Sequence, residues 1–320
     1  MADEFSIIDD YFKPLGEAIA SPNVVLGIGD DAALLTGRPG YQLAVSCDTL
    51  VAGVHFLADT PPEDIGHKAL AVNLSDLAAM GAQPAWFSIC LTLPEQNERW
   101  IQGLVNGLAV LAKQYQVPLI GGDTTHGPLT LSLQIAGWVP NGEAITRSGA
   151  QPGDQIFVAG ELGWPYIGLL LLNNTLADTA TISKTQTRMA RQQLLRPEPQ
   201  MELGSALRGL ATSMLDISDG LSADLMHILK ASKVGARLNL AAIPKAAPLT
   251  QLAPQQQWDA VNFGDEYKLL FTVPKERIAA LQSLQQRLGC SLTAVGEITE
   301  SRVLTDEHGS TIKAKGYRHF

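Results

Sequence analysis

Apolar residues in the first part of the chain fall into short runs that change between strand-like and helix-like spacing. The runs at 24–28 and 43–47 predict two short, buried strands, each of which leads into an aspartate. From Asp64 to Met80 the apolar positions recur at helical spacing, which predicts a helix. Three further elements are predicted here, a strand at 86–93, an amphipathic helix at 97–114 and a strand at 129–139.

A second cycle of strands and helices follows a stretch rich in glycine and proline, residues 140–154. We place the domain boundary in this stretch, with an N-terminal domain at 1–147 and a C-terminal domain at 148–320. Residues 173–200 are polar and are expected to form an irregular surface segment. The other predicted elements are strands at 155–159, 236–240 and 268–273, a strand-to-helix passage at 213–230 and a helix at 275–288. Two successive α/β domains indicate an α+β protein rather than one doubly wound sheet.

Composition excludes several classes of protein. A content of 46% hydrophobic and 17% charged residues is that of a compact globular chain. The net charge of −9 argues against a nucleic-acid partner, which requires a basic surface. The longest apolar run, 166–172, is too short to span a membrane, and the acidic N-terminus does not resemble a signal peptide. The three cysteines form no close-spaced pair, so we expect a cytoplasmic protein without disulfides.

Aspartates carry the candidate chemistry, because seven of them stand at the ends of apolar runs or beside glycines. Closely spaced carboxylates repel one another unless cations hold them, and Mg²⁺ prefers such hard oxygen ligands. Each aspartate also has a purely structural interpretation as a helix cap or turn residue, above all Asp30, Asp31 and Asp219. The full set is Asp30, Asp31, Asp48, Asp76, Asp123, Asp216 and Asp219.

Asp76 differs from the others because it lies in a helix-like, apolar neighbourhood between Leu74 and Leu77. An unpaired charge there is costly, which favours a metal-ligand or ion-pair role. The pairs Gly27–Gly29 and Gly121–Gly122, together with Gly220, could form phosphate-binding loops or ordinary turns. Arg147 could clamp a phosphate or be a solvated surface residue.

A dinucleotide-binding motif is suggested by the sequence GIGDDA at 27–32, with Asp48 at about the distance expected for a ribose contact. That motif requires a helix between the glycines and the second strand. Residues 33–42 contain Gly37, Pro39 and Gly40 and leave no room for one, so we reject this interpretation. The chain also contains no P-loop sequence.

At the same residues the chain resembles the thiamine-monophosphate kinases, within the superfamily of aminoimidazole ribonucleotide synthetase. The resemblance spans both domains, and its strongest blocks occur in family order as NLSDLAAMGA, GGDTT and DISDGL. It implies ATP-dependent phosphorylation of thiamine monophosphate by direct, Mg²⁺-assisted transfer. It also implies an N-terminal domain that pairs in a homodimer and a C-terminal domain that closes over the nucleotide.

The resemblance assigns roles to individual residues. Metal ligands would be Asp30, Ser46, Cys47, Asp48, Asp76, Asp123, Asp216 and Asp219. The nucleotide would contact Gly121, Gly122, Arg147 and Ser218, and thiamine monophosphate would contact His55, Asp265 or Glu266, and Tyr317. No general base is implied, because the acceptor phosphate is already ionised at neutral pH.

Three departures from the family pattern bear on the substrate site. GDEYK at 264–268 swaps the order of two acids and replaces a third by lysine, which leaves the choice between Asp265 and Glu266 open. Trp164 and Pro165 stand where small or acidic residues are usual, and Gln200 stands where arginine is common. The alternatives are another ATP-using enzyme of the superfamily, of the ribonucleotide synthetase or hydrogenase-maturation type, and a noncatalytic nucleotide- or metal-binding module.

Overall fold

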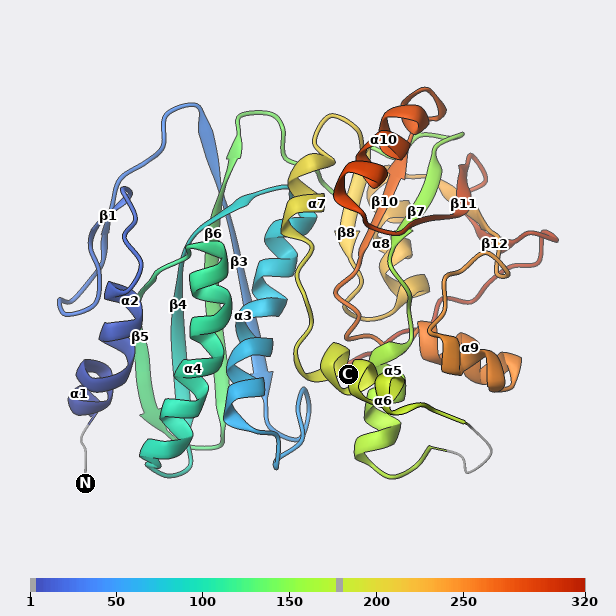
Figure 1. The fold of residues 1–320 in the computed structure, drawn as a ribbon. Coiled ribbons are helices and arrows are strands. Elements are labelled where there is room, and N and C mark those ends of the chain that lie inside the picture. Colours follow the sequence, from blue (N-terminus) through green and yellow to red (C-terminus); the bar gives the residue numbers. More distant parts are fainter. Residues whose placement is uncertain (1–3, 177–180, 320) are drawn as a thin grey trace. The chain divides into compact units, whose positions relative to one another are not determined.

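The computed structural model describes residues 4–176 and 181–319 (Figure 1). The chain forms two compact units. The first comprises the chain up to Leu77 together with Ala82–Gly142, and the second comprises Ala78–Gly81 and the chain from Glu143 onward. The main passage between the units therefore falls between Gly142 and Glu143, inside the glycine- and proline-rich stretch.

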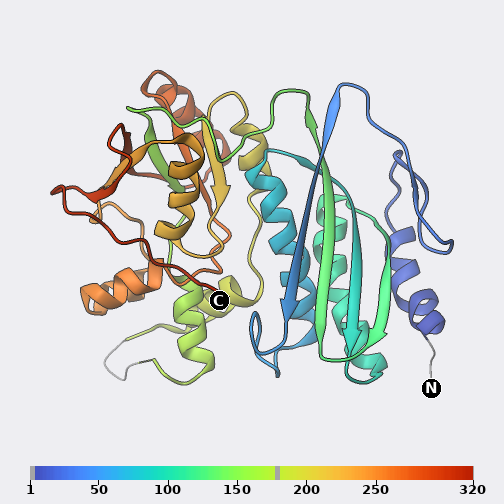
Figure 2. The same ribbon diagram turned by 180° about the vertical axis from the view of Figure 1, so that it is seen from behind.

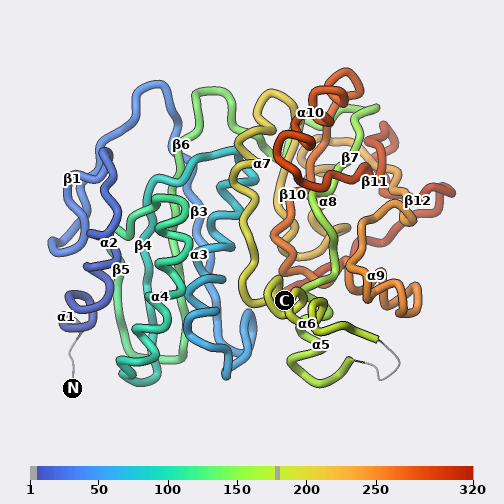
Figure 3. The backbone as a smooth tube through the Cα atoms, in the orientation of Figure 1, coloured from blue at the N-terminus to red at the C-terminus, as the bar shows by residue number. Residues whose placement is uncertain are grey.

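The first unit is built on a four-stranded sheet with the order β3-β6-β4-β5. The antiparallel pairs are β3–β6 and β6–β4, whereas β4 and β5 run parallel and are joined through α4, a connection that Figure 3 traces. The strands are β3 (Tyr41–Val51), β4 (Gln83–Leu93), β5 (Leu119–His126) and β6 (Thr130–Pro140).

Helices α3 (Pro62–Ala79) and α4 (Glu98–Tyr115) cover one face of this sheet, and Figure 2 shows that, among the described residues of this unit, no helix layer covers the other face. The fully buried Leu70, Leu74 and Leu77 of α3 and Leu104 and Leu108 of α4 form the core between helices and sheet. The remaining elements are α1 (Glu4–Ile7), a π-helical turn (Ile8–Phe12), α2 (Lys13–Glu17) and the strand pair β1 (Val24–Leu26) and β2 (Leu34–Leu35).

Both strands predicted at 24–28 and 43–47 form, but the prediction that they are buried is wrong, and only the first of them is short. β1 ends at Leu26, and β3 extends over eleven residues. Val25 is 65% exposed and Val45 is 53% exposed. Apolar residues of these two runs lie on the open face of the sheet, in β3, and in the neighbouring β1–β2 hairpin, and not in a core. Asp48 accordingly lies within β3 and not at a strand end.

The second unit contains a six-stranded sheet with the order β12-β9-β11-β7-β10-β8, antiparallel except for β12–β9. Helix α8 packs on one face and α10 on the other (Figures 1 and 2). Its strands are β7 (Gln155–Ala159), β8 (Ser213–Asp216), β9 (Gly235–Leu238), β10 (Leu269–Val273), β11 (Leu292–Thr299) and β12 (Leu304–Asp306). Its helices are α5 (Trp164–Leu172), α6 (Lys184–Leu195), α7 (Met201–Ala206), α8 (Leu221–Ser232), α9 (Pro254–Val261) and α10 (Ile278–Leu288), with 3₁₀ turns at Ala247–Gln251 and Lys275–Arg277.

The prediction of an irregular segment at 173–200 is wrong for its second half. Ser183 caps α6 through a reciprocal pair of hydrogen bonds with Gln186, and only Ala190 and Leu194 of the helix are buried. So few apolar contacts give little periodic signal. Residues 177–180 of the predicted segment lie outside the described residues.

The mixture of two α/β units with largely antiparallel sheets confirms the predicted α+β class. It also confirms the rejection of the dinucleotide-binding motif, because the residues between Gly29 and β3 form a two-residue strand and turns. Across 4–176 and 181–319, no helix combines the length and apolar character needed to cross a membrane.

Candidate functional site

A cavity of about 740 Å³ lies on the open face of the first unit's sheet. The predicted residues Asp30, Gly121, Gly122 and Asp123 line it, together with Asp31. Gly122 is required by packing, because a Cβ at this position would collide with the carbonyl oxygen of Ile89 on β4. The bare backbone of β5 is therefore available beside three carboxylates, an arrangement suited to a metal–phosphate ligand.

Lys13 also lines the cavity, at the start of α2. Its ammonium lies 3.8 Å from Asp9 and close to Gly29. Lys13 is not among the site residues predicted from the sequence. The only signal was a basic residue in an otherwise acidic N-terminal segment, which is weak because surface lysines are common.

Ser46, Asp48 and Asp76 form a second group, on the face of the sheet covered by α3. The Ser46 hydroxyl donates a hydrogen bond to Asp76 Oδ2. Burial, together with the charge and hydrogen bond of Asp76, raises the pKa of Asp48 to about 7. Two carboxylates held this close favour either a shared proton or a bound cation, and all donors in the group are hard oxygens.

Cys47 does not join this group through its sulfur. Successive side chains of a strand point to opposite faces, so Cys47 projects away from Ser46 and Asp48. It is exposed, and it pairs in register with Gln134 of β6, which lines the cavity on the open face. Only the backbone of Cys47 remains a candidate ligand beside Asp48 and Asp76.

His55 lies in the turn after β3, where its ring is fixed. Its Nδ1 accepts a hydrogen bond of 3.0 Å from the Val51 N–H. Its carbonyl oxygen accepts one of 3.1 Å from Lys68, which is buried on α3. Because Nδ1 is an acceptor, the neutral ring carries its proton on Nε2, which is therefore the nitrogen that can donate to a ligand.

In the second unit, the turn between β8 and α8 brings together three segments that are distant in sequence. The Asp265 N–H donates to the Ser218 carbonyl at 2.9 Å, and the Tyr317 N–H donates to the Asp219 carbonyl at 2.9 Å. Asp216, which is buried, ends β8 immediately before this turn. The structure thus collects the predicted residues Asp216, Ser218, Asp219, Asp265 and Tyr317 around one turn.

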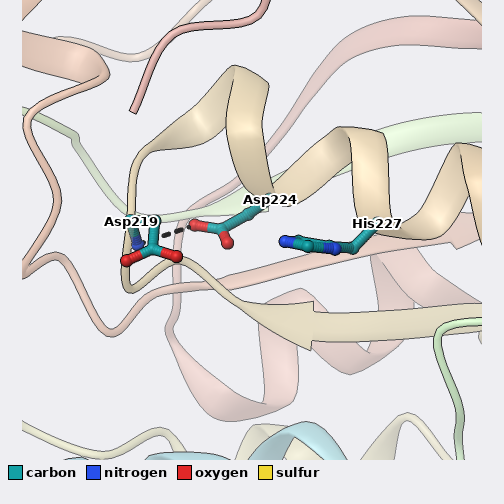
Figure 4. A group of neighbouring side chains, drawn as sticks. All are labelled: Asp219, Asp224 and His227. Atoms are coloured by element: carbon teal, nitrogen blue, oxygen red, sulfur yellow. Dashed lines mark hydrogen bonds between the residues drawn. The ribbon is translucent and has the colours of Figure 1, made fainter. Parts of the chain in front are cut away.

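Asp224 and His227, on the first turns of α8, adjoin Asp219 (Figure 4). One ligand atom from each of these three residues lies within 4.8 Å of the other two. Burial, and to a smaller extent the charge of Arg147, lowers the pKa of His227 and so favours its neutral imidazole. The predicted Arg147 contacts the far end of the same helix, where its carbonyl oxygen accepts a hydrogen bond of 3.3 Å from the Ser232 hydroxyl. Asp224 and His227 are not among the residues predicted from the sequence, although their spacing of three residues puts them on one helix face.

Glu266 and Asp265 occupy different environments. Glu266 is 2% exposed, and its carboxylate accepts a hydrogen bond from the Gly163 N–H at the start of α5. Burial raises the pKa of Glu266 to about 8, and burial lowers the pKa of the neighbouring Lys268. Asp265 is half-buried and accepts a hydrogen bond of 3.0 Å from the Tyr267 hydroxyl.

The backbone at Asp265 and Tyr267 is strained, with φ values of 59° and 50°. Such left-handed conformations cost about 1–3 kcal/mol in residues other than glycine and cluster at functional sites. Together with its partial exposure, this conformation favours Asp265 over Glu266 as the group that faces a ligand.

The other two departures from the family pattern have local explanations. Trp164 begins α5, belongs to the same buried hydrophobic cluster as Leu249 and Ala260, and donates an indole hydrogen bond of 2.8 Å to Glu161. Proline is well tolerated in the first turn of a helix, where Pro165 lies. The Gln200 amide bridges two strands, donating to the Ala159 carbonyl and accepting from the Leu269 N–H.

Comparison with known proteins identifies relatives along nearly the whole chain. The model of the AIR synthase related protein N-terminal domain matches residues 29–139, and that of the C-terminal domain matches residues 151–308. The thiamine-monophosphate kinase of Escherichia coli strain K12 is 46% identical over 324 residues, covering 99% of this chain and 98% of that protein.

Two solved structures are similar over the same extent. That of thiamine-monophosphate kinase from Stenotrophomonas maltophilia K279a has a TM-score of 0.86 at 41% identity and covers 96% of this chain and 97% of that one. That of AaThiL complexed with AMPPCP and TMP has a TM-score of 0.78 at 28% identity and covers 99% of this chain and 97% of that one.

Proposed function

This chain belongs to the thiamine-monophosphate kinases of the AIR synthase-related family, and we propose on that basis that it transfers the γ-phosphoryl group of ATP to thiamine monophosphate. The observation that carries this proposal is the similarity to curated kinases of this activity over both units. It favours the kinase over a ribonucleotide synthetase, a hydrogenase-maturation factor or a noncatalytic module. The co-substrate is ATP, and the product is thiamine diphosphate.

Mg²⁺ is proposed as the metal, because the donor sets are carboxylates and hydroxyls. The raised pKa of Asp48 supports this fit, since a cation between Asp48 and Asp76 would relieve the same repulsion that a proton relieves. When bound, Mg²⁺ would neutralise phosphate charge and polarise the phosphoryl oxygens. The proposed ligands are Asp30, Ser46, Asp48, Asp76, Asp123, Asp216 and Asp219, with the Cys47 backbone.

The protein's own part in the transfer is to bind, orient and neutralise. Gly121, Gly122, Arg147 and Ser218 are proposed to hold the nucleotide, and the Arg147 guanidinium to bind phosphate oxygens. His55 is proposed to donate from Nε2 to the phosphate of thiamine monophosphate. The ionised acceptor phosphate attacks the γ-phosphorus directly, its new P–O bond forming as the bond to ADP breaks, so no side chain has to remove a proton.

Asp265 and Tyr317 are proposed to face the thiamine rings, where a carboxylate attracts the cationic thiazolium and an aromatic ring can stack on it. Glu266 is reassigned. Because it is buried and bonded to the N-terminus of α5, we propose that it supports the 264–268 segment rather than contacting substrate.

The domain roles and assembly follow the family. Residues 1–147 are proposed to bind metal and ATP and to dimerise, and residues 148–320 to complete the substrate sites by closing over the nucleotide. Exposed Leu43 and Val45 on β3 support pairing of the first unit with a second copy. We propose that the enzyme works in the cytoplasm without nucleic-acid or membrane partners, in keeping with its net charge of −9.

An assay of ADP release tests the function. Purified protein with Mg²⁺ and ATP should release ADP only when thiamine monophosphate is added, and thiamine, which lacks the acceptor phosphate, should not replace it. With γ-labelled ATP, the label should appear in thiamine diphosphate and not on the protein, because transfer is direct. ADP release that is independent of thiamine monophosphate would refute the kinase function.

Stability of the metal-free protein should fall as pH rises from about 4 to about 7. The pKa of Asp48 is raised in the folded state, so in this window the folded chain binds a proton that the unfolded chain has lost, and the stabilisation from that proton disappears as pH passes 7. Asp224, whose pKa burial also raises to about 7, acts in the same direction. A loss on the order of 2 kcal/mol would lower Tm by about 5 °C.

Mg²⁺ should reverse this fall, because it replaces the lost proton between Asp48 and Asp76. Differential scanning calorimetry with and without Mg²⁺ at pH 5 and pH 8 measures the effect. The increase in Tm caused by Mg²⁺ should be larger at pH 8 and should shrink in Asp76→Asn. An equal increase at both pH values would argue against cation binding at this pair.

A further inference from the structure

Asp224 is a buried carboxylate that the reaction described above leaves without a role. It is 4% exposed and lies in the first turns of α8, directly behind the turn that carries Ser218 and Asp219. Burying a carboxylate is costly, and most buried acids that persist have specific partners. The partners of Asp224 are backbone groups of the turn itself.

One oxygen of Asp224 accepts hydrogen bonds from two successive backbone N–H groups. Its Oδ2 lies 3.0 Å from the Asp219 nitrogen and 3.0 Å from the Gly220 nitrogen. Figure 4 shows the Asp224 carboxylate reaching back from the helix toward Asp219, whose own carboxylate lies beside it. A single side chain thus fixes the two peptide planes on either side of the Asp219 Cα, from which the Asp219 side chain projects.

The same turn is held from its other side by glycine geometry. Gly220 has a φ of +127°, and a Cβ there would come within 2.6 Å of the Asn262 backbone. The Asp219 carbonyl is meanwhile bonded to the Tyr317 N–H at 2.9 Å. With the N–H and the carbonyl of Asp219 both engaged, its carboxylate is restricted to the rotamers that one backbone conformation allows.

We propose that Asp224 is a positioning residue, which holds the Ser218–Gly220 turn so that the Asp219 carboxylate is directed toward its metal ion. The inference rests on the proposed metal role of Asp219. It assigns Asp224 no direct contact with metal or nucleotide. Its contribution is the geometry of a hydrogen-bond acceptor, not its charge.

Two variants separate geometry from charge. Asp224→Asn keeps an oxygen at the same distance from the backbone and removes the charge, whereas Asp224→Glu keeps the charge and moves the carboxylate by one methylene. If Asp224 positions the turn, Asp224→Asn should bind Mn²⁺, used as a paramagnetic probe in the presence of AMPPCP, within about threefold of the unmodified protein. Asp224→Glu should bind it about tenfold or more weakly, equivalent to about 1.4 kcal/mol.

Ser222→Ala is the matched control, because Ser222 is buried in the same helical turn but bonds to Asn262 and Lys315 instead of the metal-bearing turn. It should leave Mn²⁺ affinity unchanged even if it lowers Tm. Electron paramagnetic resonance measures the concentration of free Mn²⁺ at each point of the titrations. The opposite order, with Asp224→Glu intact and Asp224→Asn impaired, would mean that charge or direct ligation matters and would overturn the proposal.

Hydrogen exchange gives a readout that does not depend on the kinase function. A peptide spanning residues 217–222 should exchange its amide protons at least about tenfold faster in Asp224→Glu than in Asp224→Asn, because the two N–H bonds are lost only in the former. Equal exchange in both variants would refute the positioning role. If exchange behaves as expected but the unmodified protein does not phosphorylate thiamine monophosphate, the proposed function fails and the positioning role stands.

Discussion

Asp76→Asn should lower kcat/KM by roughly a hundredfold or more, a loss of about 2.7 kcal/mol of transition-state stabilisation. Asp76 interacts with Asp48 and accepts a hydrogen bond from the Ser46 hydroxyl. It therefore links the other two members of the group formed by Ser46, Asp48 and Asp76. The amide replaces an anionic ligand by a neutral one, and its NH₂ faces Ser46 or Asp48 as a donor. Steady-state kinetics with varied Mg²⁺ measures the effect.

Asp59→Asn provides the matched control, because it makes the same chemical change at an exposed aspartate just before α3. Its kcat/KM should stay within about twofold of the unmodified enzyme. Circular dichroism should show that Asp76→Asn is folded, since removing one of two carboxylates that repel each other does not lower the stability of the fold. An Asp76→Asn enzyme with normal turnover would leave Asp76 with only a structural role.

Asp265→Asn should raise the KM for thiamine monophosphate by about tenfold while changing the KM for ATP little. A carboxylate within about 4–6 Å of a fixed cation contributes an attraction that the amide lacks. Glu266→Gln should change neither KM by more than about twofold. Burial raises the pKa of Glu266 and so favours its protonated form, which glutamine mimics.

Glu266→Ala tests whether Glu266 has a structural role or contributes nothing to stability. It leaves the Gly163 N–H without its acceptor and opens a cavity, at a combined cost of about 2–4 kcal/mol, so Tm should fall where Glu266→Gln leaves it nearly unchanged. Kinetics and thermal melts of the three variants together assign the acids. A large increase in the KM for thiamine monophosphate in Glu266→Gln, with Asp265→Asn unaffected, would reverse our assignment.

The sequence was sufficient for the strongly periodic elements and for the residue types of the site. Helix 97–114 and strands 86–93 and 155–159 have dense apolar patterns, and they lie within about three residues of α4, β4 and β7. The strand at 119–126 was missed because it reads LIGGDTTH, with glycines and polar residues where a strand normally has apolar ones. Its pairing with β4 is a tertiary effect that no local window contains.

The residue types of the site could be predicted from the sequence, but their positions in space could not. Which carboxylates are candidates followed from the sequence, whereas the placement of Asp48 and Asp123 on opposite faces of the first unit's sheet depends on the register of β3 with β6 and of β4 with β5. The choice between Asp265 and Glu266 likewise depends on which residue the backbone turns inward. Adjacent acids look alike in a sequence, and the structure separates them by the burial of Glu266, its bond to Gly163 and the partial exposure of Asp265.

The strand order β3-β6-β4-β5 has a consequence for folding during synthesis. Within the described residues, the ladder partner of β3 is β6, which ends at Pro140, whereas β3 itself ends at Val51. β3 therefore remains without its ladder partner while the ribosome adds the residues that form α3, β4, α4 and β5. Those elements can associate first, and β6 then enters between β4 and β3 and closes the sheet. During that interval Leu43 and Val45 belong to an unpaired strand, which makes this segment the one on which a nascent-chain chaperone would be expected to act.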